Sequence, residues 1–318
     1  MAALDEMKTE ARSGGLRGDG NLTVRKLLEH WRDEVLPSRS RPLAPATIVV
    51  YDWTIAVLLA ELGGIRLSKL GYDDVENAFA RLADRELGRS SLVKIRSVLG
   101  QALDFAQKRG YVVRNVARLS DIPHSASRRK HGRSLTLDQA QVLLAAAIDD
   151  RLNALWVTML YLGLRPGEAT GLCWDSVDLD GAVIHVRRSL KTGHGAMRLD
   201  DVLKTSTSRR SICASEPVIA GLRVHQARQR EQRLAVGFAW VGERWSHPVF
   251  TSSIGSPIGG KELRAAFSVL TRRAGLGHWH PHELRHSTAS LLSAAGVPIE
   301  HIADLLGHKS TVMTREVY

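Results

Sequence analysis

The last forty residues constrain the fold more than any other stretch of this 318-residue chain. They contain an apolar pattern with helical spacing that follows Pro281. On this helix His282 and Arg285 lie three positions apart and therefore share one face. The polar pair is expected to project away from the core, because apolar residues recur on the opposite side. The residues that predict this core face are Leu284, Leu291, Leu292 and Ala295.

A second helix is expected to begin at Pro298 and to end at Gly307. Proline favours the first turn of a helix, and glycine is the usual residue just past its end. His308 comes directly after that end. Ser310 can then cap a third short helix, which delivers Tyr318 at the last position.

These residues resemble the tyrosine recombinase (phage integrase) family. The resemblance rests on the HPHELRH block at 280–286, the LGHKS block at 306–310 and a tyrosine ten residues after His308. It implies a fold that is mainly α with a small antiparallel β-sheet. An N-terminal helical core-binding domain precedes the catalytic domain in that fold.

The length of 318 residues allows two ordinary domains. We expect a helical core-DNA-binding domain over 21–120, a basic linker over 121–133 and the catalytic domain over 134–318. Residues 1–20 contain four glycines and are expected to be flexible. They are either the remnant of an arm-DNA-binding domain or a disordered natural N-terminus.

The N-terminal domain is predicted to hold four to five helices between Thr23 and about Leu119, because apolar residues recur with helical spacing between turn signals. The expected helix starts are the Leu22–Val24 segment, Pro45, Asp73 (as a cap) and Ser90. The expected helix ends are Pro37, the Gly63–Gly64 pair and Gly110.

The chain carries 44 Lys and Arg against 33 Asp and Glu, a formal net charge of +11. Such an excess predicts a polyanionic partner or an anionic surface. The linker has no acidic residue between Asp121 and Asp138. Because it lies between two predicted DNA-binding domains, the linker is expected to cross the phosphate backbone of the DNA. Its positive charges should steepen the salt dependence of DNA binding.

The catalytic domain is predicted to be helical on both sides of a short β-segment. Val177 to Val186 alternates around Asp180-Gly181, which indicates a hairpin. Lys191 to Asp201 is interpreted as a loop and Ser211 to Ala214 as a third strand. The expected helices run from Thr136 to Ile148, Leu152 to Leu162, Glu216 to Leu234 and Lys261 to Ala274.

Arg165 is a candidate anion-binding residue because of Pro166. The proline biases Arg165 toward an extended conformation and pre-sets the helical turn that follows. Arg165 is therefore expected at a helix start, where free backbone N–H groups also favour an anion. The alternative is an ordinary capping arginine paired with Glu168.

Lys204 resembles the family lysine, in a Lys-Thr-x-x-Ser-x-Arg context, and Lys191 is the competing candidate. The complete set of candidate catalytic residues, in chain order, is Arg165, Lys204, His282, Arg285, His308 and Tyr318. Two Arg, a Lys and two His suit the transition state of phosphoryl transfer, because fixed cations stabilise the developing charge.

Tyr318 is the expected nucleophile. Its free pKa of about 10 leaves only ~0.1% phenolate at neutral pH, a cost of about 4 kcal/mol that nearby cations lower. His282 is expected to accept its proton. The resemblance implies that the reaction passes through a 3′-phosphotyrosine intermediate. It also implies that Lys204 donates a proton to the leaving 5′ oxygen and that His308 contacts a non-bridging phosphate oxygen. Glu168 is expected to support the site rather than to react.

The resemblance further implies a site-specific recombinase that integrates or excises a mobile element or prophage. Its expected partners are double-stranded DNA, further copies of itself in a homotetramer on paired DNA sites, and an accessory DNA-bending or excision factor. No cofactor, metal or ATP is expected, because the chain has neither a nucleotide-binding glycine motif nor a convincing acidic cluster. Family members usually continue past the tyrosine with a segment that docks on a neighbouring protomer.

Cys173 and Cys213 have no metal-ligand spacing around them and are expected to be buried thiols in a reducing cytosol. No apolar run reaches the ~18 residues of a membrane span, and no secretory leader is visible. An intracellular protein is therefore expected, and the resemblance implies a DNA-associated protein of the bacterial cytoplasm. Two other functions remain open: a non-catalytic DNA-binding protein with this fold, and a type IB topoisomerase.

Overall fold

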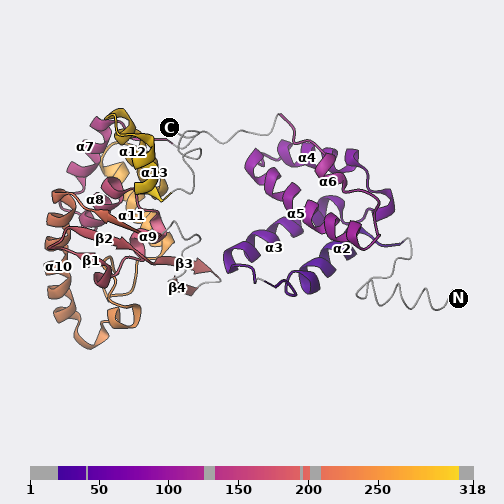
Figure 1. Ribbon diagram of the computed structural model, residues 1–318. Coiled ribbons are helices and arrows are strands. Elements are labelled where there is room, and N and C mark those ends of the chain that lie inside the picture. Colours follow the sequence, from indigo (N-terminus) through magenta and orange to yellow (C-terminus); the bar gives the residue numbers. More distant parts are fainter. Residues whose placement is uncertain (1–20, 41, 125–132, 194–195, 201–208, 308–318) are drawn as a thin grey trace. The chain divides into compact units, whose positions relative to one another are not determined.

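The computed structural model describes residues 21–40, 42–124, 133–193, 196–200 and 209–307. The chain divides into two compact units, residues 1–130 (unit 1) and residues 131–318 (unit 2). Unit 1 is helical, whereas unit 2 combines helices with two small antiparallel sheets (Figure 1). The expected fold class, mainly α with a small antiparallel β-sheet, is confirmed.

Unit 1 begins its helices where the local sequence predicts them. The side chain of Thr23 accepts a hydrogen bond from Lys26 N and caps the first helix, and Pro45 is the first residue of the next. One predicted cap is wrong: Asp73 lies inside its helix, and Asp74 accepts the N–H of Gly71 instead. The described helices are α2 (Val24–His30), the π-helical turn η1 (Trp31–Val35), α3 (Pro45–Leu62), α4 (Tyr72–Asp84), α5 (Arg89–Lys108) and α6 (Val116–Leu119), with a 3-10 turn η2 (Leu67–Lys69).

The core of unit 1 forms where the apolar faces of these helices meet. Trp31, Phe79 and Ile95 are among the fully buried side chains, and the Trp31 ring stacks on the Tyr51 ring at 5.8 Å. A buried amide ties α5 to α6, because Asn115 donates to the carbonyl of Gly100 at 2.7 Å. Unit 1 therefore has a continuous hydrophobic core of its own.

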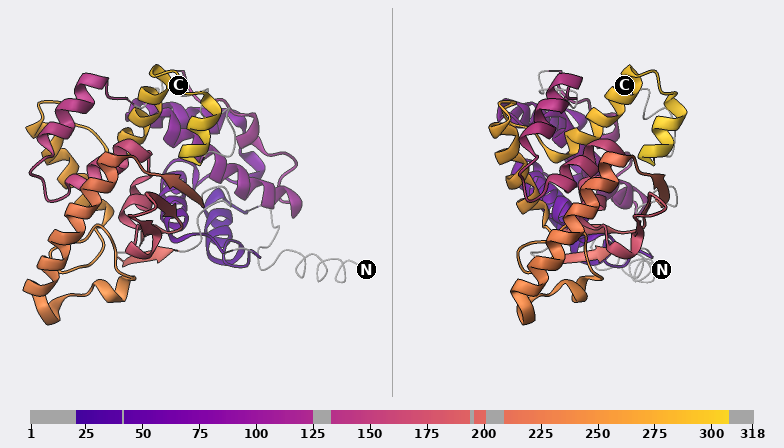
Figure 2. Two further views of the ribbon diagram at one scale, coloured as in Figure 1. Left: turned by 60° about the vertical axis from the view of Figure 1, so that its left-hand side comes forward. Right: turned by 90° about the vertical axis from the view of Figure 1, so that its left-hand side faces the viewer.

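Unit 2 is built around α8, most of whose residues are buried. Most of the helices predicted in this part of the chain are present within a few residues of their expected ends. The described helices are α7 (Leu137–Ala146), α8 (Asn153–Leu162), α9 (Pro166–Thr170), α10 (Glu216–Val236), α11 (Gly260–Arg273), α12 (Pro281–Ala294) and α13 (Ile299–Leu306). The C-terminal end of α10 and the segment after it project from the rest of unit 2 (Figures 1 and 2).

The sheets contain one confirmed hairpin and one that the sequence did not predict. The strands are β1 (Val177–Asp178), β2 (Val183–Val186), β3 (Ser189–Gly193), β4 (Ala196–Asp200) and β5 (Arg210–Cys213). β1, β2 and β5 form an antiparallel sheet in which His185 pairs with Ser211, as expected for a third strand near 211–214. The prediction of a loop from Lys191 to Asp201 is wrong. The described residues of this stretch belong to the strands of the β3–β4 hairpin, in which Lys191 pairs with Arg198 and Gly193 with Ala196.

Two glycines of the α9 region allow β3 to approach this short helix closely. A Cβ atom at Gly171 would lie 2.6 Å from the backbone nitrogen of Leu190. A Cβ atom at Gly167 would lie 2.9 Å from the backbone carbonyl oxygen of Leu190. Contact of this kind between backbone atoms requires glycine. It fixes α9, and with it the residue at its N-terminus, against the β3–β4 hairpin.

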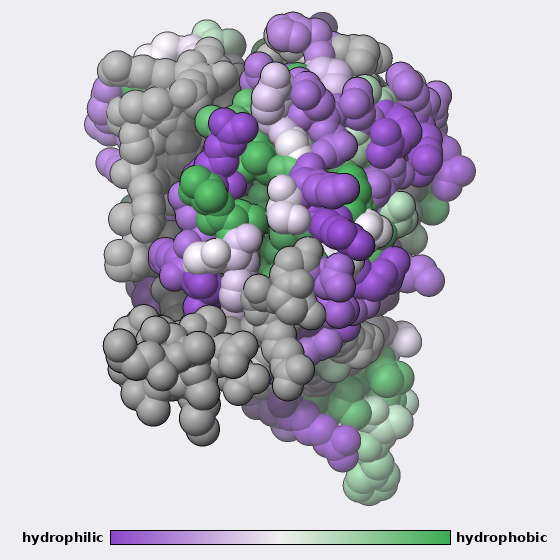
Figure 3. Space-filling model, turned by 90° about the vertical axis from the view of Figure 1, so that its right-hand side faces the viewer, coloured by the Kyte–Doolittle hydropathy of each residue, from purple (hydrophilic) through white to green (hydrophobic). Residues whose placement is uncertain are grey.

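The face drawn in Figure 3 carries both polar and apolar residues. The face in Figure 3 is mostly hydrophilic, with a smaller group of hydrophobic residues near its centre. Among the described residues, no helix combines the length and apolar character that crossing a membrane requires. Cys173 is buried as predicted, but Cys213 is exposed, because it lies on the outward side of β5.

Candidate active site

Arg165 lies at the N-terminus of α9, as the sequence predicts. Gly163 ends α8 in a left-handed conformation (φ +58°), and Arg165 is extended (φ −63°, ψ 147°) before Pro166 begins the helix. The backbone N–H of Arg165 donates to Glu168 Oε2 at 3.0 Å, and its Nη1 donates to Glu168 Oε1 at 2.7 Å. The pairing with Glu168, which belonged to the alternative interpretation of Arg165, is therefore present.

Glu168 is a buried carboxylate, 4% exposed, that pairs with two arginines. Arg210, at the start of β5, donates to Glu168 Oε2 at 3.0 Å. Burial alone would raise the pKa of Glu168, but Arg210 and Arg165 outweigh it and hold the pKa below its ordinary value. Glu168 is therefore ionised, and it fixes both guanidinium groups.

Arg285 is buried, 3% exposed, which contradicts the prediction that it projects away from the core with His282. Its Nη1 donates to the carbonyl of Gly163 at 2.8 Å, and its Nη2 donates to the carbonyl of Leu306 at 2.6 Å. The reason is that α12 is covered on more than one side. Thr288, one turn further along α12, donates to the carbonyl of Leu160 in α8. Ala295, predicted on the core face, is exposed and lies beyond the end of α12.

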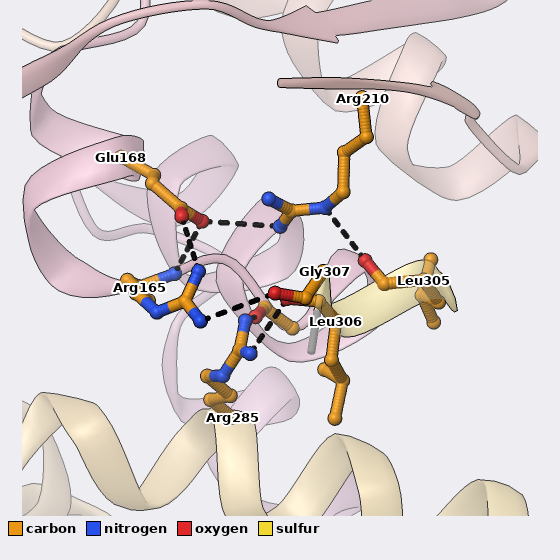
Figure 4. Close-up of polar contacts among 8 residues, drawn as sticks. Arg165, Glu168, Arg210, Arg285, Leu305, Leu306 and Gly307 are labelled. Carbon is orange, nitrogen blue, oxygen red and sulfur yellow. Dashed lines mark hydrogen bonds and ion pairs between the residues drawn. The ribbon is translucent and has the colours of Figure 1, made fainter. Parts of the chain in front are cut away.

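Three arginines converge on the C-terminal end of α13 (Figure 4). Three consecutive carbonyls there each accept a hydrogen bond from a different guanidinium group. Leu305 accepts from Arg210 at 2.7 Å, Leu306 from Arg285 at 2.6 Å and Gly307 from Arg165 at 3.5 Å. The last carbonyls of a helix have no partner within the helix and carry partial negative charge, so cations are stabilised there. We name Arg165, Arg210, Arg285 and Glu168 the arginine cluster.

The three arginines differ in their access to solvent. The side chain of Arg165 is 36% exposed and that of Arg210 is 8% exposed. Arg165 can therefore meet a phosphate without a rearrangement of the fold, whereas Arg210 is placed to hold the cluster together. A guanidinium group pairs with phosphate oxygens through two parallel hydrogen bonds, so the cluster is suited to a phosphodiester.

His282 is exposed in the first turn of α12, one turn before Arg285. Its ring meets the ring of His286 edge to face, with centroids 5.1 Å apart. Burial, together with the charge of Arg285, lowers the pKa of His286, against an opposing effect of Glu283. His286 is therefore a neutral neighbour for the His282 imidazole at physiological pH.

Three of the candidate residues, Lys204, His308 and Tyr318, lie outside the described residues. The competing candidate Lys191 lies on β3 and forms an ion pair with Asp200. The structure thus brings Arg165 and Arg285 to one helix end, at the residue that precedes His308. It also places Arg210, in the strand that follows the Lys204 segment, in the same cluster.

Sequence reasoning missed Arg210 as a member of the site. The residue stands at the end of the Lys-Thr-x-x-Ser-x-Arg stretch, which was used to choose Lys204. The same stretch could therefore have indicated Arg210 as a further site residue. Its partners Glu168 and Leu305 are 42 and 95 residues away, so no local pattern could show the contacts.

The comparisons with known proteins agree on one family. Residues 133–318, more than half of the chain, match the sequence profile of the phage integrase family. An integrase of Streptomyces ambofaciens is 35% identical over 269 residues, which cover 81% of this chain and 66% of the relative. The chain thus spans just under two thirds of that relative's length. A XerC-like tyrosine recombinase of Caldanaerobacter subterraneus subsp. tengcongensis is 25% identical over 332 residues, covering 98% of this chain and 84% of the relative.

Solved structures show the same fold. The integrase of the Tn1549 transposon, in complex with transposon right end DNA, matches with a TM-score of 0.80 at 20% identity. The match covers 93% of this chain and 95% of that one. A lambda integrase dimer bound to a COC′ core site matches with a TM-score of 0.68 at 19% identity, covering 98% and 80%. At these identities the likeness establishes the fold alone.

Proposed function

This chain belongs to the phage integrase family, and on that premise we propose that it is a site-specific DNA recombinase of the integrase type. It cuts and rejoins double-stranded DNA to integrate or excise a mobile element. The tyrosine recombinase named among its relatives and the integrases solved on DNA support this assignment.

The arginine cluster is the observation that carries the proposal. Two arginines from separate parts of the chain, Arg165 and Arg285, meet at the end of α13 inside the family-matched region. Cations fixed in this way stabilise charge that develops on a phosphoryl group, because they need no reorganisation during the reaction. The segment with His308 and Tyr318 starts at the same helix end.

In the cleavage step the Tyr318 hydroxyl oxygen attacks the phosphorus of a DNA phosphodiester. The new Tyr–O–P bond forms as the bond between phosphorus and the 5′ oxygen breaks, which leaves a 3′-phosphotyrosine and a free 5′-hydroxyl. His282 accepts the phenolic proton, and Lys204 donates a proton to the departing oxygen. In this scheme Arg165 and His308 bind the non-bridging oxygens, and the buried Arg285 adds a fixed positive charge to the site.

Rejoining reverses these steps with a 5′-hydroxyl from the second DNA strand. That hydroxyl attacks the phosphotyrosine, the Tyr–O–P bond breaks and Tyr318 regains its proton. The covalent intermediate is itself a phosphodiester, so the energy of the broken bond is conserved and the exchange needs no ATP. We place this reaction in a homotetramer on two DNA sites, helped by an accessory DNA-bending or excision factor. The solved lambda integrase tetramer on a Holliday junction supports the tetramer.

Trapping the covalent intermediate tests the proposal. A nicked suicide substrate carrying the attachment site loses a short strand after cleavage, so the adduct accumulates and is counted on a denaturing gel. Tyr318→Phe is expected to abolish the adduct, because phenylalanine has no nucleophilic oxygen. Tyr161→Phe is the matched control: it removes the hydroxyl of an exposed tyrosine on α8. It is expected to form the adduct at the wild-type rate.

An adduct with Tyr318→Phe equal to that of wild type would overturn the assignment of the nucleophile. Specific DNA binding without any adduct would favour a non-catalytic DNA-binding protein. Relaxation of supercoiled plasmid that lacks a recombination site would favour a type IB topoisomerase instead.

A further inference from the structure

Arg133 makes a set of contacts that the proposed function does not use. It is the last residue of the predicted basic linker and the first described residue of unit 2. Its guanidinium carbon lies 4.3 Å from the centroid of the Trp279 ring. The same group donates to the backbone carbonyl of His278, and its Nε lies 3.5 Å from Glu283 Oε1.

These partners lie in the segment just before α12 (His278 and Trp279) and in its first turn (Glu283), and α12 is the helix that carries His282. Trp279 is 5% exposed, and its indole N–H donates to the carbonyl of Leu276 at 3.0 Å. Glu283 also caps the helix, because its Oε2 accepts the backbone N–H of His280 at 2.7 Å. Arg133 therefore contacts the residues on both sides of His280, where the chain enters the helix.

A second contact next to Arg133 reaches the following turn of the helix. The backbone N–H of Leu135 donates to Ser287 Oγ at 2.9 Å, and this bond is buried. Ser287 in turn donates to the carbonyl of Glu283 at 2.7 Å. The point at which the linker enters unit 2 is thus bonded to the first two turns of α12.

We propose that Arg133 is a positioning residue for His282, which fixes the start of α12 and ties the linker to the site. The inference rests on the proposed function, because it assigns His282 a role in the reaction. His282 is exposed, whereas Thr288 and Ala289 in the second and third turns of α12 are buried in the core. Loss of Arg133 is therefore expected to disturb the start of the helix more than its later part.

The contacts require an arginine rather than any cation. A planar guanidinium can stack on an indole while its edge donates to a carbonyl and a carboxylate, and a lysine ammonium cannot do both. The side chain of Arg133 is 50% exposed, so its ion pair with Glu283 contributes little to the stability of the fold. The role of Arg133 can therefore be separated from folding.

The test compares Arg133→Ala and Arg133→Lys with wild type in the full chain, on the nicked suicide substrate at saturating DNA. Both variants are expected to form the covalent adduct about tenfold more slowly, since small misplacements of a reacting group lower rates by one to two orders of magnitude. The thermal midpoint should stay within a few degrees of wild type. Arg244→Ala is the matched control, because it removes one exposed positive charge from unit 2 without touching α12; its adduct rate should equal that of wild type.

A double-mutant cycle with His282→Ala separates positioning from a general structural role. If Arg133 acts through His282, Arg133→Ala should cause no further loss of rate in the His282→Ala background. A full tenfold further loss in that background would overturn the inference. So would wild-type rates for Arg133→Ala, or an equal loss for Arg244→Ala.

Hydrogen exchange gives a readout that does not depend on the reaction. Amides at the start of α12, residues 280–285, are expected to exchange several-fold faster in Arg133→Ala than in wild type or Arg244→Ala. If the amides exchange faster in Arg133→Ala but wild type forms no adduct, the contact of Arg133 with the start of α12 is supported and the proposed function is refuted. Unchanged exchange and unchanged rate, with an active wild type, would refute the positioning role alone.

Discussion

Each unit contains a glutamate that pairs with two arginines, and the two arrangements differ in their surroundings. In unit 1, Glu61 accepts from Arg81 at 2.9 Å and from Arg85 at 2.8 Å. In unit 2, Glu168 accepts from Arg165 at 2.7 Å and from Arg210 at 3.0 Å. The two carboxylates are similarly covered, with side chains 6% and 3% exposed.

The arginines of the two units differ in their exposure to solvent. In unit 1 they are 48% and 64% exposed, so water can solvate either guanidinium group if the pair breaks. In unit 2, Arg210 is 8% exposed, and both arginines also donate to carbonyls at the end of α13. In unit 1 the glutamate and its two arginines form ion pairs at the surface. In unit 2 the same set of charges connects three elements, α9, β5 and α13.

The comparison shows that the number of ion pairs in a unit does not indicate how much each pair contributes to stability. A pair with exposed cations contributes at most about 1 kcal/mol, because solvation competes with it. A buried pair is strongly destabilising to break, since the partner is left charged and unsolvated. The arginine cluster is therefore expected to be rigid, which suits a site that must present fixed cations to a phosphate.

Removing each carboxylate should show the largest contrast. Glu168→Gln keeps the shape of the side chain but leaves Arg210 buried without its counter-charge, so the free energy of unfolding should fall by about 3 kcal/mol. Glu61→Gln in unit 1 should lower it by about 1 kcal/mol. Urea denaturation of the full chain, followed by circular dichroism, measures both. Equal losses in the two variants would mean that the burial of Arg210 does not matter.

Substituting one arginine in each cluster should give a smaller contrast. Arg210→Lys keeps the charge but cannot reach both Glu168 and the carbonyl of Leu305, so a loss of about 2 kcal/mol in unfolding free energy is expected. Arg85→Lys keeps a solvated cation near Glu61 and should change that free energy by less than about 0.5 kcal/mol. The same denaturation assay applies. A neutral Arg210→Lys would show that charge alone, without the geometry of the guanidinium group, holds the cluster.

Acid should reveal the smallest of the three effects. The folded-state pKa of Glu168 is depressed below its ordinary value of 4.5, by its two arginines against the opposing effect of burial. Its contribution to stability is therefore fully present above about pH 4.5 and is lost as the pH falls through the lower folded-state pKa. The stability gap between wild type and Glu168→Gln should be constant from pH 7 to pH 5. Below pH 4 it should narrow; a gap that widens there would contradict the depressed pKa.

Local signals in the sequence predicted most of the helices and the start of the site. Thr23 and Thr136 cap the helices that they were expected to begin, and Gly163 and Gly307 end α8 and α13 with positive φ. Arg165 lies at a helix start because of the proline after it. These features depend on interactions within about four residues, so a single sequence contains them.

The β3–β4 hairpin, the burial of Arg285 and the membership of Arg210 were not predictable in this way. Whether a glycine-containing segment pairs as a hairpin depends on what packs against it, here the glycines of α9. The exposure of Arg285 depends on α8 and on the end of α13, which lies 21 residues further along the chain. Its other carbonyl partner, Gly163, is 122 residues away.

The sequence by itself determined the order of the motifs, the family and the residue types that the site can use. The tertiary structure alone decided which of those cations are buried, that Arg210 joins Arg165 on Glu168, and which helix end the cations share. The physical reason is distance along the chain. Caps and periodicity act between neighbours, whereas the desolvation and pairing of a charge depend on whichever segments the fold brings around it.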